Sequence, residues 1–372
     1  VVLTGCFPQA FEEEASALDE CGIIVGTGAK KEIPALIKRY ITSGERIIRI
    51  VPRERGEAFE KMTNSGADQK TRAYIKIQDG CDQYCTYCII PKLRGNYRSF
   101  PLERLVKEAE ELAEQGVKEL ILVAQETTLY GTDLYGKKSL HLLLKELCKI
   151  KGIRWIRVQY CYPEEIYDEL IQTIKEEPKV CHYLDLPIQH ASDRILKRMG
   201  RRTTQAELVE IVNKLRREIP DIVLRTTLIS GFPGETQEDH EELMSFVDEM
   251  EFDRLGVFTY SPEEDTPAAT MPDQVAEEVK EARRDEIMEL QQEISFEKAE
   301  DMVGKSLWCM IEGKVADEYA YVARTYKDAP GVDGYLFVQT LEELMSGDFV
   351  KVRVTGADEY DLIGEIDDEF TE

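Results

Sequence analysis

Six strand-like segments separated by amphipathic helices fill the middle of this chain, and this alternation limits the fold more than any other feature. The segments are residues 73–78, 119–124, 155–160, 183–186, 223–229 and 255–260. Between the first two, apolar residues recur at helical spacing from Leu102 to Ala113. Such units favour parallel strands joined by right-handed crossovers. An α/β fold that closes as an open, partial (β/α)6 barrel is therefore predicted.

Three cysteines come directly after the first of these strands. Cys81, Cys85 and Cys88 have the spacing CxxxCxxC on one short loop. Three thiolates can hold three irons of a [4Fe-4S] cube and leave the fourth iron open for chemistry. A structural zinc site would need a fourth ligand, usually from a second pair, and no suitable pair follows. A disulfide framework is typical of small secreted domains, whereas this chain has 372 residues and an odd number of cysteines, nine.

Polar side chains gather where the predicted strands end. Residues 123–127 end the second strand, residues 187–190 the fourth, and residues 229–235 the fifth. In a parallel barrel the functional groups lie at the carboxyl ends of the strands. We therefore expect these segments to meet the cysteine loop at one mouth. The alternative is that they are ordinary residues of strand-to-helix loops.

The chain is acidic, with a formal net charge of −26. Charge of this sign repels nucleic-acid phosphates and attracts basic partners. No uninterrupted apolar run approaches the roughly 18 residues of a membrane helix. A cytoplasmic protein without membrane contact or direct nucleic-acid binding is therefore expected.

The last quarter of the chain has a different pattern. Residues 272–303 are charged and helical, with Leu290 and Ile294 placed to pack against the barrel. Five short strands then follow, broken by glycine, proline and aspartate, at residues 307–313, 319–324, 335–339, 349–356 and 361–366. A small antiparallel β-barrel is predicted.

The cysteine loop, with Tyr87 in its aromatic position, resembles the radical S-adenosylmethionine (radical SAM) enzymes. The resemblance implies that the open iron binds and reduces S-adenosylmethionine to give a 5'-deoxyadenosyl radical. It also implies that protein side chains mainly orient the cofactor and tune the cluster. Tyr87 would lie at the cofactor, and no side chain is expected to act as a catalytic nucleophile or acid-base group.

The same resemblance places five further residues at the cofactor. Gln125 and Glu126 would contact the methionine amino group, and Arg225 would pair with the methionine carboxylate. Gln189 would contact the ribose or the carboxylate. Gly231 would let the backbone approach the adenosine.

The C-terminal barrel resembles the TRAM domain, which together with a radical SAM barrel is typical of the methylthiotransferases. These transferases of sulfur-containing groups carry a second, auxiliary [4Fe-4S] cluster on three cysteines of an N-terminal domain. Residues 1–9 match the surroundings of its third cysteine, so Cys6 is the expected ligand. The first two cysteines have no counterpart. An amino-terminally truncated protein is expected, with a remnant of the α/β N-terminal domain and an incomplete auxiliary cluster.

This resemblance divides the chain into four segments. Residues 1–55 would be the C-terminal part of the N-terminal domain, residues 56–66 a linker, residues 67–298 the radical SAM core and residues 299–368 the TRAM domain. One S-adenosylmethionine would methylate sulfur at the auxiliary cluster. Another would generate the radical, with electrons from a donor such as flavodoxin or ferredoxin.

The substrate branch is indicated by two motifs. Residues 183–192 and 328–334 resemble the branch that modifies an aspartate β-carbon of small-subunit ribosomal protein twelve. The tRNA branches usually have Gln-Ser-Gly-Ser where this chain has Gln-His-Ala-Ser at residues 189–192. Residues 301–372 carry 17 acidic and 6 basic side chains, which suits a basic ribosomal protein better than RNA. The acidity could also serve solubility alone.

Two alternatives to this function remain. A tRNA adenosine methylthiotransferase of the MiaB or MtaB type would keep the same clusters but bind RNA with strong salt dependence. A non-catalytic iron–sulfur protein that interacts with the ribosome would hold a cluster without cleaving S-adenosylmethionine.

Overall fold

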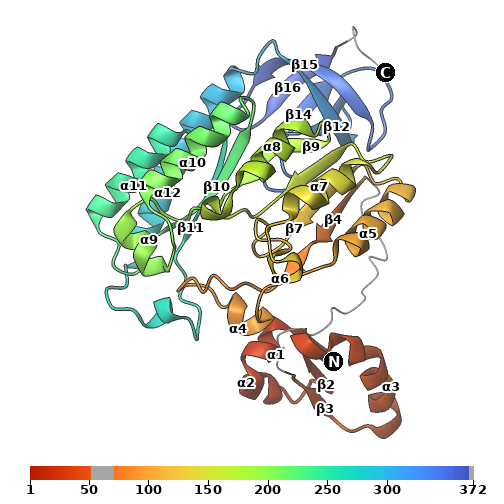
Figure 1. Ribbon diagram of the computed structural model, residues 1–372, viewed down its shortest axis with the longest axis vertical. Helices are drawn as coiled ribbons and strands as arrows, with labels where there is room; N and C mark the ends of the chain where they lie inside the picture. Colours follow the sequence, from red (N-terminus) through yellow and green to blue (C-terminus); the bar gives the residue numbers. More distant parts are fainter. Residues whose placement is uncertain (52–70, 368–372) are drawn as a thin grey trace.

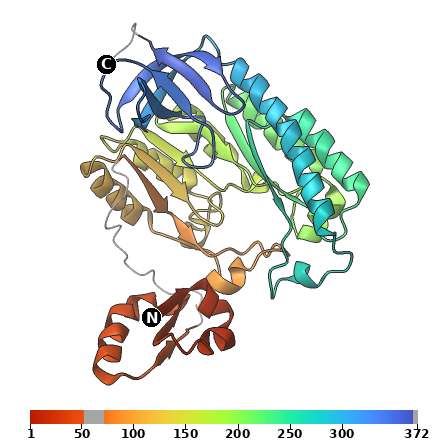
Figure 2. The ribbon, with the colours of Figure 1, turned by 180° about the vertical axis from the view of Figure 1, so that it is seen from behind.

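The computed structural model describes residues 1–51 and 71–367, so the expected linker at residues 56–66 lies outside the described residues. The chain forms a small α/β unit, a central parallel sheet wrapped by helices, and a C-terminal barrel (Figure 1). Figure 2 shows the same three parts from behind. The small unit lies at one end of the central sheet and the C-terminal barrel lies at the other.

The central sheet has six strands in the order β11-β10-β9-β8-β7-β4, and every neighbouring pair is parallel. Edge strands β4 and β11 are not paired with each other, so the barrel is open, which confirms the predicted fold class. The strands are β4 (Arg72–Lys76), β7 (Glu119–Val123), β8 (Trp155–Val158), β9 (Val180–Asp185), β10 (Val223–Ser230) and β11 (Arg254–Thr259).

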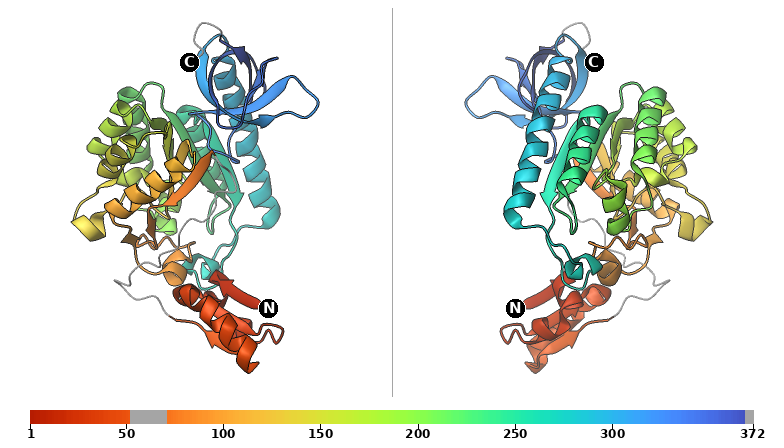
Figure 3. Two further views of the ribbon diagram at one scale, coloured as in Figure 1. Left: turned by 90° about the vertical axis from the view of Figure 1, so that its right-hand side faces the viewer. Right: turned by 90° about the vertical axis from the view of Figure 1, so that its left-hand side faces the viewer.

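Helices cover one face of this sheet (Figure 3). In α5 the buried residues Leu105, Ala109 and Leu112 follow the predicted helical period. The helices are α4 (Ile90–Arg94), α5 (Leu102–Glu114), α6 (Thr132–Tyr135), α7 (Leu140–Cys148), α8 (Asp168–Glu176), α9 (Asp193–Met199), α10 (Gln205–Glu218), α11 (Gln237–Met250) and α12 (Glu277–Glu300), with 3-10 turns at Pro163–Glu165 and Pro267–Thr270.

Alternate residues of each strand face the inside of the barrel, which we call the lumen. In β10, Leu224 and Leu228 are buried in the core beneath the helices. The intervening residues Arg225, Thr227 and Ile229 are only partly buried. Because side chains alternate across a strand, these three face the lumen.

The C-terminal domain is a closed barrel in the order β12-β13-β14-β16-β15, as predicted. Four of its pairings are antiparallel, and β14 and β16 are parallel. A closed ring of five strands cannot alternate direction all the way round, so one parallel pair is unavoidable. The strands are β12 (Ser306–Lys314), β13 (Ala320–Thr325), β14 (Leu336–Gln339), β15 (Phe349–Ala357) and β16 (Leu362–Ile366).

This barrel packs against the amino-terminal part of the lumen. Trp155 and Tyr183 of the sheet form one buried cluster with Met310 and Ala329 of the C-terminal domain. The Trp155 ring meets Phe349 edge to face, with centroids 4.8 Å apart. The C-terminal domain therefore forms the floor of the lumen.

A charged network is buried in this interface. The Glu119 carboxylate lies 3.0 Å from Nε of Arg157 and 2.6 Å from Nη2 of Arg324, and all three side chains are at most 1% exposed. Arg157 also donates hydrogen bonds to the backbone carbonyls of Thr325 and Tyr326. The two domains are thus joined by paired charges that water cannot reach.

The N-terminal unit has three parallel strands in the order β1-β2-β3. Its helix α1 packs on α4, and Oγ1 of Thr27 donates a hydrogen bond of 3.1 Å to the Leu93 carbonyl. Its elements are β1 (Val2–Gly5), α1 (Cys6–Ala10), α2 (Glu12–Ser16), β2 (Ile23–Gly26), a 3-10 turn (Thr27–Glu32), α3 (Ile33–Ser43) and β3 (Ile47–Arg49). Within the described residues, no helix combines the length and apolar character needed to cross a bilayer.

Candidate iron–sulfur and cofactor site

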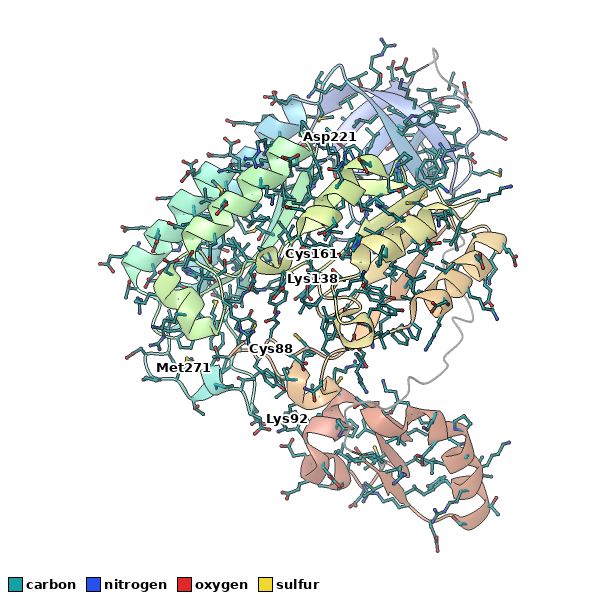
Figure 4. All side chains as sticks on the ribbon, in the orientation of Figure 1. Cys88, Lys92, Lys138, Cys161, Asp221 and Met271 are labelled. Atoms are coloured by element: carbon teal, nitrogen blue, oxygen red, sulfur yellow. The ribbon has the colours of Figure 1, made fainter. Side chains whose placement is uncertain are left out.

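The three predicted cluster ligands lie on one loop at the carboxyl end of β4. Cys81 and Cys85 are buried, Cys88 is half-buried, and all three are free thiols. The loop is tied down by hydrogen bonds from the Cys81 amide to the Gly95 carbonyl and from the Thr86 amide to the Met199 carbonyl. In Figure 4, Cys88 lies at the end of the sheet that is nearest the N-terminal unit.

The chemistry of this loop suits an iron–sulfur cube. Burial raises the pKa of the Cys81 thiol to about 12, and the nearby Cys85 and Cys88 sulfurs add to the rise. Three thiolates would therefore repel one another without a positive centre between them. Among the described residues, no three His, Cys, Asp or Glu side chains lie close enough together to coordinate a single metal ion. A cube fits this spacing better, because its ligands sit on separate irons.

Gly80, which sequence reasoning missed, fixes the start of the loop. Its φ is +79°, and a Cβ there would lie 2.2 Å from the Asn96 carbonyl oxygen and 2.5 Å from that of Gly95. Both neighbours are backbone atoms, so they cannot swing aside. Only glycine fits this position. A glycine directly before the first cysteine was the available sequence signal.

Replacing Gly80 by alanine is expected to reduce cluster loading several-fold, because the backbone must move at the first ligand. Gly116→Ala is the matched control: its φ is +95°, but no atom lies within 4 Å of the added Cβ. Both changes carry a left-handed strain of roughly 1–2 kcal/mol. Iron content and cluster absorbance after anaerobic reconstitution measure the difference. Equal loading of the two variants would show that the contact at Gly80 is unimportant.

A buried cation lies beside the Cys85 sulfur. The Tyr162 hydroxyl is 3.4 Å from Sγ of Cys85, and the Arg201 guanidinium stacks 4.2 Å above the Tyr162 ring. Arg201 pairs with Glu164 at 3.0 Å, and its side chain has no exposed surface. Its Nε and Nη1 have no hydrogen-bond partner among the described residues. Unpaired guanidinium nitrogens that stack on the tyrosine contacting a ligand sulfur suit an anionic group such as a cluster.

The two residues predicted at the cofactor amino group differ in availability. Oε1 of Gln125 is buried without a partner in the described structure, so it can accept a hydrogen bond from an ammonium group. The Glu126 carboxylate is buried and already accepts from the amides of Thr128 and Leu129, at 2.7 and 2.8 Å. Burial raises the pKa of Glu126 to about 7 in spite of these donors. Gln125 is therefore available for the predicted contact with the amino group. Glu126 instead holds the loop that follows β7 through its hydrogen bonds to the Thr128 and Leu129 amides.

Gln189 and Gly231 lie together at the rim. Gln189 has a φ of +72°, and its backbone bridges to β10 through hydrogen bonds with Thr227 and Ile229. Gly231 has a φ of +69°, and an added Cβ would lie 2.2 Å from Cγ of Lys280. The glycine therefore admits the Lys280 side chain from α12. The predicted approach of the Gly231 backbone to adenosine stays a prediction.

The remaining predicted contacts have protein partners. Tyr87 packs edge to face with Phe232, with ring centroids 6.3 Å apart, against a buried cluster that includes Tyr260. Nη1 of Arg225 donates to Asp185 at 2.9 Å, and Nε lies 3.4 Å from Asp333 of the C-terminal domain. Arg225 therefore already has two carboxylate partners, and its predicted contact with the methionine carboxylate stays a prediction. The sequence alone could not predict the contact of Arg225 with Asp333, because the two residues are 108 positions apart in the chain.

Cys6 is the first residue of α1 and is half-buried. Helix α1 packs against α4, which begins two residues after Cys88. The expected auxiliary ligand therefore belongs to the unit that adjoins the cysteine loop.

Comparisons with known proteins agree with this geometry. The radical SAM superfamily pattern matches residues 75–247, and the TRAM domain pattern matches residues 303–366. The ribosomal protein uS12 methylthiotransferase RimO of Lachnoclostridium phytofermentans is 57% identical, covering 98% of this chain and 82% of that protein. RimO of Clostridium perfringens is 49% identical, covering 98% and 81%.

A likeness to solved structures is weaker. The radical S-adenosylmethionine methyltransferase TsrM of Kitasatospora setae, solved with cobalamin and a [4Fe-4S] cluster, is 19% identical with a TM-score of 0.45. The match covers 53% of this chain and 38% of TsrM.

Proposed function

The chain belongs to the RimO family of radical SAM methylthiotransferases, and on that premise we propose that it replaces a hydrogen on an aspartate β-carbon of ribosomal protein uS12 by a methylthio group. The observation that carries this proposal is the 57% identity to a RimO protein over nearly the whole chain. The free cysteine loop at the barrel mouth supplies the matching chemistry.

The family implies a [4Fe-4S] cluster and S-adenosylmethionine, and Cys81, Cys85 and Cys88 would hold the cluster. The cluster with S-adenosylmethionine supplies a 5'-deoxyadenosyl radical that can take hydrogen from an unactivated carbon. Gln125 would orient the cofactor amino group. Tyr87 and Tyr162 pack around the loop and exclude water from the ligand sulfurs.

A second cluster, held in part by Cys6, is also proposed. The contact between α1 and α4 supports it, because it brings the N-terminal unit against the segment that follows Cys88. Residues 1–55, 67–298 and 299–368 are proposed as the three domains. We further propose a cytoplasmic enzyme that takes electrons from a donor such as flavodoxin or ferredoxin. The excess of acidic side chains in the C-terminal domain suits a basic ribosomal protein.

The function is tested by anaerobic reconstitution followed by incubation with dithionite, S-adenosylmethionine and purified small ribosomal subunits. The expected products are 5'-deoxyadenosine and a uS12 aspartate carrying one methylthio group, both measured by mass spectrometry. Radical formation without modification of uS12, while a tRNA in the same assay is modified, would overturn the substrate assignment.

Replacing Arg201 by glutamine is expected to make the cluster potential more negative by tens of millivolts. The reduced cluster is the more anionic state, so loss of a buried cation beside Cys85 disfavours it. Arg202→Gln is the matched control, because Arg202 is the next residue and is exposed. Redox titration followed by electron paramagnetic resonance measures the potential. An unchanged potential in Arg201→Gln would show that Arg201 packs in this region without tuning the cluster potential.

A further inference from the structure

Arg225 is a lumen-facing cation shared by two domains. Its Nη1 donates hydrogen bonds to Asp185 at 2.9 Å and to Thr227 at 3.2 Å. Its Nε lies 3.4 Å from Oδ1 of Asp333, a residue of the C-terminal domain that is itself 2% exposed. Asp333 accepts hydrogen bonds of 2.8 Å from the Tyr183 hydroxyl and from the Ala329 amide. The guanidinium is therefore held in one orientation from both domains.

One donor of this guanidinium is left open. Nη2 of Arg225 donates no hydrogen bond to any residue that the structure describes, and the side chain keeps 17% of its surface exposed. The backbone of Gly256 lies beside it: a Cβ there would be 3.8 Å from Nη2. The absence of a side chain at Gly256 leaves room next to the free nitrogen.

The other arginines of the lumen are less suitable for an incoming ligand. Arg157 is fully buried in the ion network with Glu119. Arg72 and Arg254 begin their strands and pair with Glu312 and Asp328 of the C-terminal domain. Arg225 keeps the largest exposed fraction of these four side chains, 17% against 14% for Arg72 and Arg254 and none for Arg157.

The open side of the barrel carries exposed aromatic side chains. The edge strands β4 and β11 are not paired, so the barrel is open on that side. Exposed aromatic residues belong to both edges: Tyr74 of β4 is 47% exposed, and Phe258 of β11 is 63% exposed. Exposed aromatic side chains on a polar surface are typical of contact sites for protein segments.

We propose that Nη2 of Arg225 binds the carboxylate of the substrate aspartate, and that Asp333 positions the guanidinium for it. This inference rests on the proposed function, which makes an aspartate side chain the group to be modified. Guanidinium and carboxylate form directional, charge-assisted pairs. Holding the carboxylate fixes the neighbouring β-carbon from which hydrogen is removed. The C-terminal domain thereby becomes part of the substrate site.

The charges around Arg225 are compatible with a third carboxylate. Burial raises the pKa of both Asp185 and Asp333, although Arg225 acts in the opposite direction. Each carboxylate is therefore more easily protonated than an exposed aspartate. A proton taken up by one of them would offset the negative charge that the substrate brings.

The test is a double-mutant cycle between enzyme and substrate. The wild-type reaction first identifies the modified aspartate of uS12, and uS12 with that aspartate replaced by asparagine is then prepared. Wild-type enzyme is expected to bind native uS12 at least tenfold more tightly than the asparagine form, which corresponds to about 1.4 kcal/mol. Arg225→Gln should bind both forms alike. Equal discrimination by the two enzymes would overturn the inference.

Controls separate this inference from the proposed function and from misfolding. Arg217→Gln removes an exposed arginine on α10 and should leave the discrimination intact. If Arg225→Gln does not fold, Asp333→Asn is the second test, because it removes the carboxylate that positions the guanidinium while its amide oxygen can still accept from Tyr183. Asp333→Asn should discriminate between the native and the asparagine form of uS12 several-fold less than the wild-type enzyme; unchanged discrimination overturns the inference. A wild-type enzyme that never modifies uS12 would instead refute the proposed function.

Discussion

Cys85→Ala is expected to abolish reductive cleavage of S-adenosylmethionine, with 5'-deoxyadenosine falling to the background of the assay. A cube held by two of its three thiolates is labile, and the remaining sulfurs cannot replace the lost ligand. The loss should exceed the roughly 10–100-fold effect typical of removing a partner of a ligand. The measurement is 5'-deoxyadenosine and methionine formed with dithionite under anaerobic conditions, together with iron content.

Cys148→Ala is the matched control for this change. Cys148 ends α7 and is half-buried against the main core, away from the loop. Its replacement should leave iron content and radical formation unaltered. Radical formation that survives in Cys85→Ala would mean that this loop does not hold the reactive cluster.

Glu119→Gln is expected to lower the free energy of unfolding by about 3–5 kcal/mol, because it leaves two buried guanidinium groups without their shared carboxylate. Glu119 lies 3.0 Å from Arg157 and 2.6 Å from Arg324 in a site with almost no exposed surface, and Arg324 keeps Glu312 as its other carboxylate partner, at 2.7 Å. The change should also loosen the C-terminal domain, because Arg324 belongs to β13. Denaturant titration followed by tryptophan fluorescence measures both effects, since Trp155 and Trp308 lie at or near this interface.

Glu146→Gln provides the comparison at the surface. Its pair with Lys149 at 2.7 Å is exposed, so the change should cost no more than about 0.5 kcal/mol. Equal losses of unfolding free energy in Glu119→Gln and Glu146→Gln would show that the buried Glu119 network does not contribute to stability.

The pH dependence of stability should identify the same carboxylate. Burial alone would raise the pKa of Glu119, but Arg157 and Arg324 outweigh it and hold that pKa below its usual range. The stabilisation is therefore present above the pKa of the unfolded chain and is lost as pH falls through the lower pKa of the folded protein. Glu119→Gln should flatten this acid branch of the stability curve.

The sequence by itself determined the repeating architecture and the reactive loop. Strand and helix periods are local properties, so all six central strands and the five strands of the C-terminal barrel could be placed within a few residues. The spacing of Cys81, Cys85 and Cys88 is also local, because one short loop carries all three ligands. A closed ring of five strands requires at least one parallel pair, but strand patterns alone did not reveal that β14 and β16 form it.

Only the tertiary structure decided which polar groups are available. Gln125 and Glu126 are neighbours in sequence. Gln125 has an unpaired acceptor oxygen in the described structure, whereas the Glu126 carboxylate already accepts hydrogen bonds from backbone amides. The sequence did not show that Arg225 pairs with Asp333, because the fold brings these two residues together. Nor did any sequence pattern single out Arg201, which the fold places over the Tyr162 ring. Whether a charged group can bind a ligand depends on its burial and its partners. Those partners come from distant parts of the chain, so no local pattern encodes them.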